Sequence, residues 1–293
     1  MAAVGTAPPP TEAMRRGVSR GLFVATVVIV AIIMLAAGLY VGKTVLGSSS
    51  SSAKPFVVGT NVPFPPFEDY NVTTSQYFGF DISMAAMIAA AMHRPLLITN
   101  YADFTALLTD AGAGVFDMAA SAITESGTVG AGRNLSMTFS MPYYEANQAL
   151  LIQSSKASQI KCAPSGCNVS VMAGLKIGLQ TGTSSEDWAN TYLLHNETGG
   201  GSITEYTTVD LEVSALSAGA LDAVIIDTGP AAAIAAGSSG SLAVAGVIHT
   251  GELYGFAVEH GDPNDYLPVI NGAIVTSEQN GTYQKLLTTW GLG

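Results

Sequence analysis

Short strand-like runs alternate with helical segments in two successive cycles, and this alternation constrains the fold more than any other feature of the chain. The first cycle runs from Phe56 to Ser121 and the second from Leu175 to Asp227. Such an alternation predicts a mainly parallel sheet with helices on both faces. We therefore expect an α/β fold built from two similar units. The expected strands are 56–60, 96–101, 116–121, 175–180, 203–208 and 221–227, and the expected helices are 79–92, 103–114, 183–193 and 209–219.

The chain is expected to pass from one unit to the other and to return. Residues 142–153 (PYYEANQALLIQ) indicate a β-rich connection, and residues 252–260 (ELYGFAVEH) indicate a return strand. Residues 265–293 then supply closing helices. A chain that crosses and returns has two hinge strands and a cleft between two lobes. Lobe 1 is predicted at 55–148 and 254–293, and lobe 2 at 149–253.

The last strand of the second cycle ends on a carboxylate rather than on a turn residue. In LDAVIID the run Ala223–Ile226 is continuously apolar, which is typical of a strand buried on both faces of a parallel sheet. Asp227 then lies at the carboxyl end of that strand, where open α/β sheets place their ligands. Asp227 could equally cap a helix that begins near Pro230, and this stretch alone favours the cap.

An uncharged stretch near the N-terminus, residues 22–41 (LFVATVVIVAIIMLAAGLYV), is long enough to cross a membrane. As a helix it would span about 30 Å, the thickness of one hydrocarbon core. Three arginines precede it, which favours a cytoplasmic leader at 1–21 and an external remainder. A Ser-rich linker follows at 42–54. We expect one membrane span with the binding domain on the outer face of the cell membrane.

Cleavage of the leader stays open at the level of sequence. The apolar stretch is longer than the h-region of a secretory signal peptide, and no A-x-A site follows it. The segment RRGVSRGLF (15–23) also looks like a prepilin-type signal, which is processed just before the apolar helix. Both alternatives leave the helix on the protein, and the second would allow a surface assembly of many copies.

The external part of the chain is acidic. Of the 11 basic and 22 acidic residues, six basic and 21 acidic ones lie from Pro55 onward. A surface so poor in lysine and arginine argues against a nucleic-acid partner. The only cysteines, Cys162 and Cys167, have no histidine near them and indicate a small disulfide loop rather than a zinc site. Five sequons give candidate glycosylation sites at Asn71, Asn134, Asn168, Asn196 and Asn280.

Eight short motifs occur in an order that resembles one protein family. They are GTNVPFPPFE, GFDISMAAMIAAAM, DFTALL, FDMAASAIT, an arginine six residues before FSMPYY, LKIGLQTGTSSE, GALDAVIID and NGTYQKLLTTW. Together they resemble the polar amino-acid-binding proteins of ABC importers, which have the type II periplasmic-binding fold, and the resemblance extends over nearly all of residues 55–293. The resemblance implies two lobes that close on a free amino acid, delivery to an ABC permease, and no metal or cofactor.

The resemblance also implies two charged contacts with the ligand. Arg133 matches the arginine that binds the α-carboxylate, and a guanidinium fork suits a carboxylate because it can donate two parallel hydrogen bonds. Asp227, five residues after Asp222, matches the aspartate that binds the α-ammonium group. This role would account for the carboxylate at the strand end, and it is compatible with capping.

Smaller contacts follow from the same resemblance. Thr124 matches a hydroxyl that bonds the ligand, and Ala122 matches a position that offers its backbone. Thr183 and Ser184 lie where a helix N-terminus gives N–H groups and hydroxyls to a carboxylate, although ordinary N-capping is the alternative.

Three further positions bear on the ligand's side chain or on the carboxylate contact. Phe64 and Phe104 match positions that hold the ligand's side chain, and without the resemblance both would be expected in the core. Asn61 stands where several binders of cationic amino acids have an acidic residue, which favours a neutral polar or apolar ligand. A Gly-rich insertion, TESGTVGAGR, precedes Arg133 and would put the carboxylate contact in doubt if it displaced the arginine.

Two alternatives to a transport binding protein stay open. An enzyme on this fold, of the cyclohexadienyl dehydratase kind, would need a general acid or base in the cleft, and Glu68 and Glu125 are candidates. No HExxH, GxSxG or Cys–His motif accompanies them, so an enzyme is not expected. The other alternative is a sensory or surface-assembly subunit that has kept the binding fold.

Overall fold

The structure is a computed structural model that describes residues 53–193 and 202–293. Within these two ranges, no helix is long and apolar enough to cross a membrane. The predicted leader and membrane span (1–41) lie outside the described residues and stay predictions. The described residues belong to one compact unit, Ala53–Gly293.

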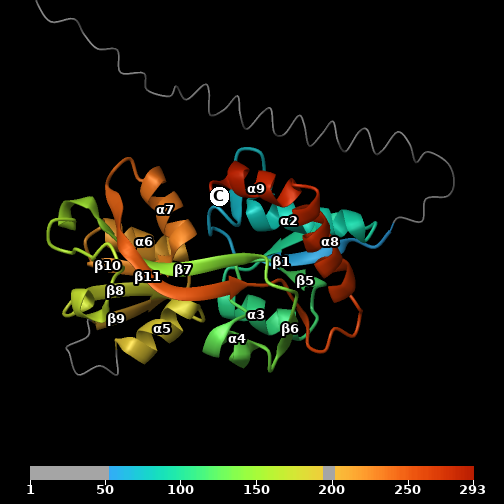
Figure 1. The fold of residues 1–293 in the computed structure, drawn as a ribbon, viewed down its shortest axis with the longest axis horizontal. Coiled ribbons are helices and arrows are strands. Elements are labelled where there is room, and N and C mark those ends of the chain that lie inside the picture. Colours follow the sequence, from blue (N-terminus) through green and yellow to red (C-terminus); the bar gives the residue numbers. More distant parts are fainter. Residues whose placement is uncertain (1–52, 194–201) are drawn as a thin grey trace, which may run out of the picture. The chain divides into compact units, whose positions relative to one another are not determined.

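The first sheet is mixed, and helices cover both of its faces (Figure 1). Its strands, in order, are β4 (Leu96–Asn100), β1 (Phe56–Thr60), β5 (Met118–Ala119), β12 (Ala257–Glu259) and β6 (Met137–Phe139). β1 pairs in parallel with β4 and β5, whereas β12 runs antiparallel to β5 and β6. The helices around it are α2 (Phe80–Ala91), α3 (Phe104–Gly112), α4 (Gly127–Arg133), α8 (Leu267–Gln279) and α9 (Thr282–Trp290).

Separate apolar clusters fill the two sides of the first sheet. On one side, Phe56 of β1 packs with Met84 and Ile88 of α2 and with α8, while α9 packs at the edge of this cluster. On the other side, Leu107 of α3 packs with Met137 of β6. A small hairpin of β2 (Asp69–Asn71) and β3 (Gln76–Phe78) precedes α2. The apolar runs of the first cycle thus form a core on each face of the sheet.

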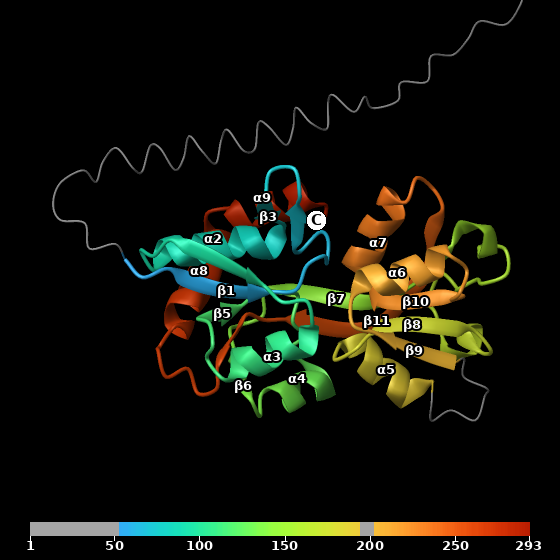
Figure 2. The same cartoon turned by 180° about the vertical axis from the view of Figure 1, so that it is seen from behind.

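The second sheet has the same layered build (Figure 2). Its strands, in order, are β11 (Leu242–Tyr254), β7 (Tyr144–Gln153), β10 (Ala223–Asp227), β8 (Lys176–Gln180) and β9 (Ser202–Tyr206). β10, β8 and β9 are parallel, and β7 runs antiparallel to β10 and β11. Its helices are α5 (Ser184–Tyr192), α6 (Val209–Ser217) and α7 (Thr228–Gly237). α5 packs on one face, and α6 and α7 on the other.

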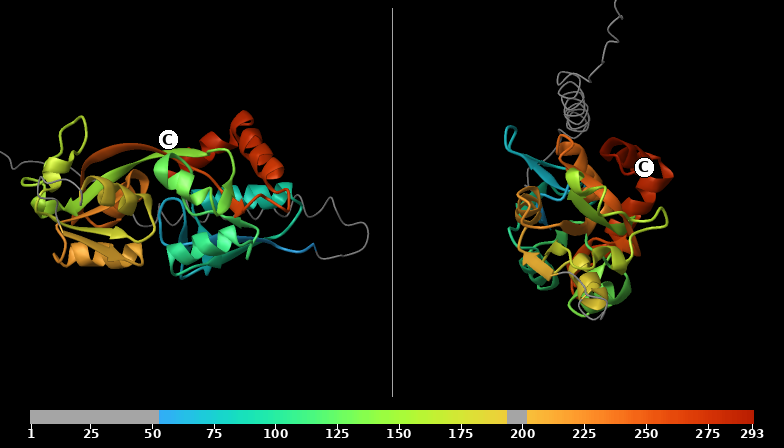
Figure 3. Two further views of the ribbon diagram at one scale, coloured as in Figure 1. Left: turned by 90° about the horizontal axis from the view of Figure 1, so that it is seen from below. Right: turned by 90° about the vertical axis from the view of Figure 1, so that its left-hand side faces the viewer.

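Two long strands carry the chain between the sheets. β7 follows β6 of the first sheet along the chain, and β11 leads back to β12. The long strands β7 and β11 pair with each other from Tyr144 opposite Tyr254 to Gln153 opposite Leu242 (Figure 3). The predicted two-lobed α/β fold with two hinge strands is confirmed. The predicted lobe boundaries fall within β7 and near the end of β11, so these strands belong in part to both lobes.

Local sequence accounts for where several helices begin. The side chain of Asp103 accepts a hydrogen bond from the N–H of Ala106 at 2.8 Å, which caps α3. Gly79, directly before α2, has φ 132°, and a Cβ there would lie 2.1 Å from the carbonyl oxygen of Phe67. Only glycine fits this close approach, which fixes the segment containing Glu68 against the start of α2.

The predicted disulfide is confirmed, with Cys162 bonded to Cys167 and their Cα atoms 4.6 Å apart. Three sequon asparagines, Asn134, Asn168 and Asn280, are exposed, and Asn71 is partly exposed. The sequon at Asn196 lies outside the described residues. Glycosylation stays a prediction at all five positions.

Candidate functional site

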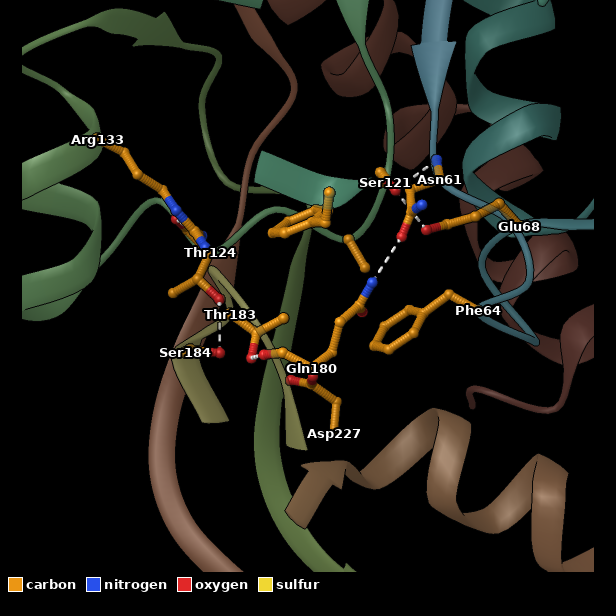
Figure 4. A pocket seen from close by; sticks show the side chains of 12 residues that line it. Asn61, Phe64, Glu68, Ser121, Thr124, Arg133, Gln180, Thr183, Ser184 and Asp227 are labelled. Atoms are coloured by element: carbon orange, nitrogen blue, oxygen red, sulfur yellow. Dashed lines mark hydrogen bonds between the residues drawn. The ribbon is translucent and has the colours of Figure 1, made fainter. Parts of the chain in front are cut away.

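A pocket lies between the two sheets, at the carboxyl ends of β1, β8 and β10 (Figure 4). Its empty space is about 320 Å³, its open mouth included. All nine ligand-binding residues expected from the sequence line it, together with three that were not assigned to ligand binding. The lining residues are Asn61, Phe64, Glu68, Phe104, Ser121, Ala122, Thr124, Arg133, Gln180, Thr183, Ser184 and Asp227.

Arg133 reaches the pocket despite the Gly-rich insertion. The insertion folds into α4, which ends at Arg133 and leaves its side chain only 9% exposed. The guanidinium donates to the carbonyl oxygens of Thr124 at 2.8 Å and Gly182 at 2.9 Å, and it lies over the ring of Phe104. No carboxylate of the described chain forms an ion pair with it. Burial lowers the pKa of Arg133 to about 10, so the side chain remains a cation at neutral pH.

Three hydroxyl groups surround the same side of the pocket. Thr183 caps α5, because its hydroxyl accepts from the N–H of Glu186 and donates to the carbonyl of Gln180. The capping role therefore occupies this hydroxyl. The hydroxyls of Thr124 and Ser184 lie 3.3 Å apart, and both face the space beside Arg133 in Figure 4.

Asp227 lines the pocket, and its side-chain hydrogen bonds in the described ranges all go to one carboxylate oxygen. It occupies the N-cap position of α7, but its side chain makes no capping hydrogen bond, so the capping role suggested by the local sequence is wrong. Its Oδ1 instead accepts from Gln148 Nε2 at 2.9 Å and from the Tyr254 hydroxyl at 2.7 Å. Oδ2 accepts no side-chain hydrogen bond within the described ranges. A cation with N–H donors could bind there.

The two hinge strands contribute a network that the sequence analysis missed. Gln148 of β7 donates to Asp227 and also to Glu252 Oε1 at 2.9 Å, and the Thr124 hydroxyl donates to Glu252 Oε2 at 2.8 Å. Gln148, Glu252 and Tyr254 are all buried. The signal in the sequence was a polar residue, Gln148, directly before the apolar run Ala149–Ile152 of β7.

Side chains also join the two lobes across the pocket. The Nε2 of Gln180, at the end of β8, donates to Oδ1 of Asn61, which follows β1, at 3.0 Å. The Nδ2 of Asn61 donates to the carbonyl of Tyr101 at 2.7 Å. Both ends of the Asn61 amide are therefore engaged within the protein.

Ala122 offers a carbonyl rather than an N–H group. Its φ is 45°, and its N–H donates to Oδ2 of the buried Asp81 at 2.8 Å. The backbone group that remains for a ligand is its carbonyl oxygen, which suits an ammonium group.

The pH dependence of stability provides a first test of this site. Burial, followed by the charge of Glu252, raises the pKa of Asp227 to about 8. The folded chain thus keeps a proton that the unfolded chain loses above its ordinary pKa, so this group's stabilising effect is lost as pH rises toward about 8. Urea unfolding of the ligand-free protein should show stability falling from pH 5 to 8. Asp227→Asn should flatten part of this slope, and an unchanged slope would contradict the assignment.

The comparisons with known proteins point in one direction. The model of the family described as "Bacterial extracellular solute-binding proteins, family 3" matches residues 56–293. The L-cystine-binding protein TcyJ of Escherichia coli (strain K12) is 24% identical over 236 residues, which cover 80% of this chain and 81% of that protein. The ABC transporter arginine-binding protein 1 of the same strain is 26% identical over 250 residues, covering 82% and 92%. An ancestral arginine-binding protein bound to arginine has 25% identity and a TM-score of 0.69, covering 82% of this chain and 99% of that one.

Proposed function

Because the chain belongs to family 3 of the bacterial extracellular solute-binding proteins, we propose that its pocket captures one free amino acid and that the protein delivers it to an ABC importer. The relatives are named for different amino acids, cystine and arginine. Family membership therefore supports an amino acid as the ligand and leaves its side chain open.

The observation that carries this proposal is a basic and an acidic side chain in one pocket, each with hydrogen-bonding capacity to spare. Arg133 has five N–H donors, and the hydrogen bonds within the described chain take up two of its nitrogens, both to carbonyl oxygens. Asp227 keeps Oδ2 for an ammonium group. The α-carboxylate and α-ammonium groups of a zwitterion match these two positions.

Lobe closure is the proposed mechanism of capture. Arg133 and Asn61 belong to the first lobe by their position beside its sheet, and both bond to groups that follow or end β8 of the second sheet. A ligand that contacts both lobes would favour this closed arrangement over an open one. The two hinge strands β7 and β11 are the segments that would bend.

The location of the protein is proposed from the N-terminal sequence alone. The uncharged stretch 22–41 would hold the chain at the cell membrane, with the pocket on the outer face next to an ABC permease. The proposal includes a surface assembly of many copies because of the prepilin-like segment at 15–23. Crosslinking on intact cells would separate an assembly from single tethered copies.

The alternative function to test for is an enzymatic activity in the same pocket. Glu68 lines the pocket, whereas Glu125 does not. Burial, followed by the charge of Asp81, raises the pKa of Glu68 well above its ordinary value, which is also a property of catalytic acids. Incubation with a cyclohexadienyl acid should give no product, and turnover of such a compound would replace the binding proposal.

Thermal unfolding with each of the twenty amino acids tests the proposed function. A ligand that binds only the folded state stabilises it by about 2.7 kcal/mol at a hundredfold excess over its Kd. For a protein of this size that is a rise in Tm of roughly 5–10 °C. We expect one chemical group of amino acids to produce this rise in the full-length chain in detergent solution. No rise with any of the twenty would contradict the proposal.

A further inference from the structure

Glu68 lines the pocket and has one carboxylate oxygen without a hydrogen-bond partner in the described ranges. Its side chain is fully buried, and its Oε1 accepts a hydrogen bond from the Ser121 hydroxyl at 2.7 Å. Its Oε2 is buried without a partner, and no other described residue that lines the pocket has such an atom. Buried polar atoms are nearly always satisfied, so the missing partner indicates a group that the pocket takes up.

Glu68 lies away from the positions proposed for the two charged ends of an amino acid. Figure 4 shows Glu68, Asn61 and Ser121 together on one side of the pocket, with Arg133 and Thr124 on the other. A zwitterion held by Arg133 and Asp227 would therefore direct its side chain toward Glu68.

The polar neighbours of Glu68 are already engaged. Asn61 donates to a carbonyl and accepts from Gln180, and the Gln180 amide also donates to the carbonyl of Thr207. Ser121 donates to Glu68 and accepts from the N–H of Asn61. Glu68 is therefore the side chain at this end with an oxygen that makes no hydrogen bond within the described ranges.

Buried acidic groups outnumber buried basic ones in the part of the chain that the structure describes. Of the buried charged residues in the described ranges, five are acidic and one, Arg133, is basic. Burial, followed by the charges of Asp81, Asp227 and Asp69, raises the pKa of Glu68 and favours its protonated form in the empty pocket. A cationic group would supply the missing charge as well as the missing donor.

We propose that Glu68 binds the end of the ligand's side chain, and that this end is a cation with N–H donors, such as a guanidinium or an ammonium group. The inference rests on the proposed function, because it concerns the side chain of the amino acid held there. A cationic ligand differs from the neutral one that Asn61 alone favoured. The Asn61 amide is already engaged between the lobes, whereas Oε2 of Glu68 has no partner in the described ranges.

Pairs of ligands with and without a cationic side-chain end test this inference without any mutation. Isothermal titration of the full-length chain would compare arginine with citrulline and lysine with norleucine. In at least one pair the cation should bind about tenfold or more tightly, as expected for a charge-assisted hydrogen bond to a buried carboxylate. Equal or tighter binding of the neutral member in both pairs would overturn the inference.

Two variants test whether Glu68 causes the preference for a cationic side chain. Glu68→Gln keeps an acceptor for Ser121 and should reduce the ratio of cation to neutral affinity to about one, because the charge is gone. Glu145→Gln removes an exposed carboxylate that neither lines the pocket nor is among the charges that act on Glu68, and it should keep the ratio. A preference that survives in Glu68→Gln would place the cation elsewhere and contradict the assignment.

Release of the Glu68 proton on ligand binding tests the inference on the unmutated protein, so the result does not depend on whether a variant folds. Binding of the cation to Glu68 should drive its proton into solvent, whereas binding of the neutral analogue should not. Titration in two buffers of different ionisation enthalpy measures this release, and Asp227 contributes equally to both ligands. Equal release within each pair contradicts the Glu68 assignment alone. Absence of binding by every amino acid contradicts the proposed function instead.

Discussion

Replacing Arg133 by alanine is expected to abolish ligand binding at ordinary concentrations. Removing one partner of a buried, hydrogen-bonded charge pair costs about 2–5 kcal/mol, which is roughly 30-fold to several thousand-fold in Kd. The loss should be near the upper end, because the ligand carboxylate would then face Glu252 and Asp227, two of the three acidic residues whose charges act on Arg133, with no compensating cation. Isothermal titration with the best ligand from the thermal screen measures the change.

Arg94 provides the matched control for this variant. It is the other arginine of the described chain, and it forms an ion pair with Asp117 at 2.6 Å outside the pocket lining. Arg94→Ala should lower the melting temperature and leave the Kd unchanged within about threefold. Equal losses of affinity in Arg94→Ala and Arg133→Ala would show that general destabilisation, rather than a carboxylate contact, explains the result.

The second large effect is expected for Asp227→Ala. The ligand's ammonium group would lose its carboxylate, and Gln148 Nε2 and the Tyr254 hydroxyl would lose an acceptor. We expect affinity to fall about 100-fold, within the range for a buried charged contact. Asp222→Asn is the control, because Asp222 precedes the same strand but pairs with Lys156 away from the pocket. Binding that is retained in Asp227→Ala would remove the ammonium assignment.

An analogue without the α-amino group sharpens the Asp227 result. Such a ligand should bind the unchanged protein weakly and should lose little further affinity in Asp227→Ala, since the contact is absent from both. A full additional loss with this analogue would mean that Asp227 acts on the fold of the pocket rather than on the ammonium group.

Local sequence patterns were sufficient for most of the fold. The apolar run Ala223–Ile226 forms the fully buried strand β10, because a strand covered on both faces requires such a run. The helix predicted from residue 103 forms as α3, and the structure shows that the Asp103 side chain caps its start. By contrast, the helix α4 in the Gly-rich insertion was not predicted, since glycine disfavours helices and its position depends on packing near Arg133.

The sequence predicted only some of the residues that form the pocket. Asp227 was noticed through its place at a strand end, while the role of Arg133 came only from the family resemblance. Glu252 was not predicted, because its place beside Gln148 depends on an irregularity in strand pairing between Ile248 and Glu252. The residues there give no local signal of this irregularity. Contacts that depend on the register of two strands far apart in the sequence are decided by tertiary structure.

A crystal structure of the protein with the amino acid that raises the Tm most would test the central claim most directly. The account predicts the α-carboxylate within hydrogen-bond distance of the Arg133 guanidinium and the α-ammonium group at Oδ2 of Asp227, between two lobes that both contact the ligand. A ligand bound outside this pocket, or held in it with neither charged end on these two residues, would contradict the account.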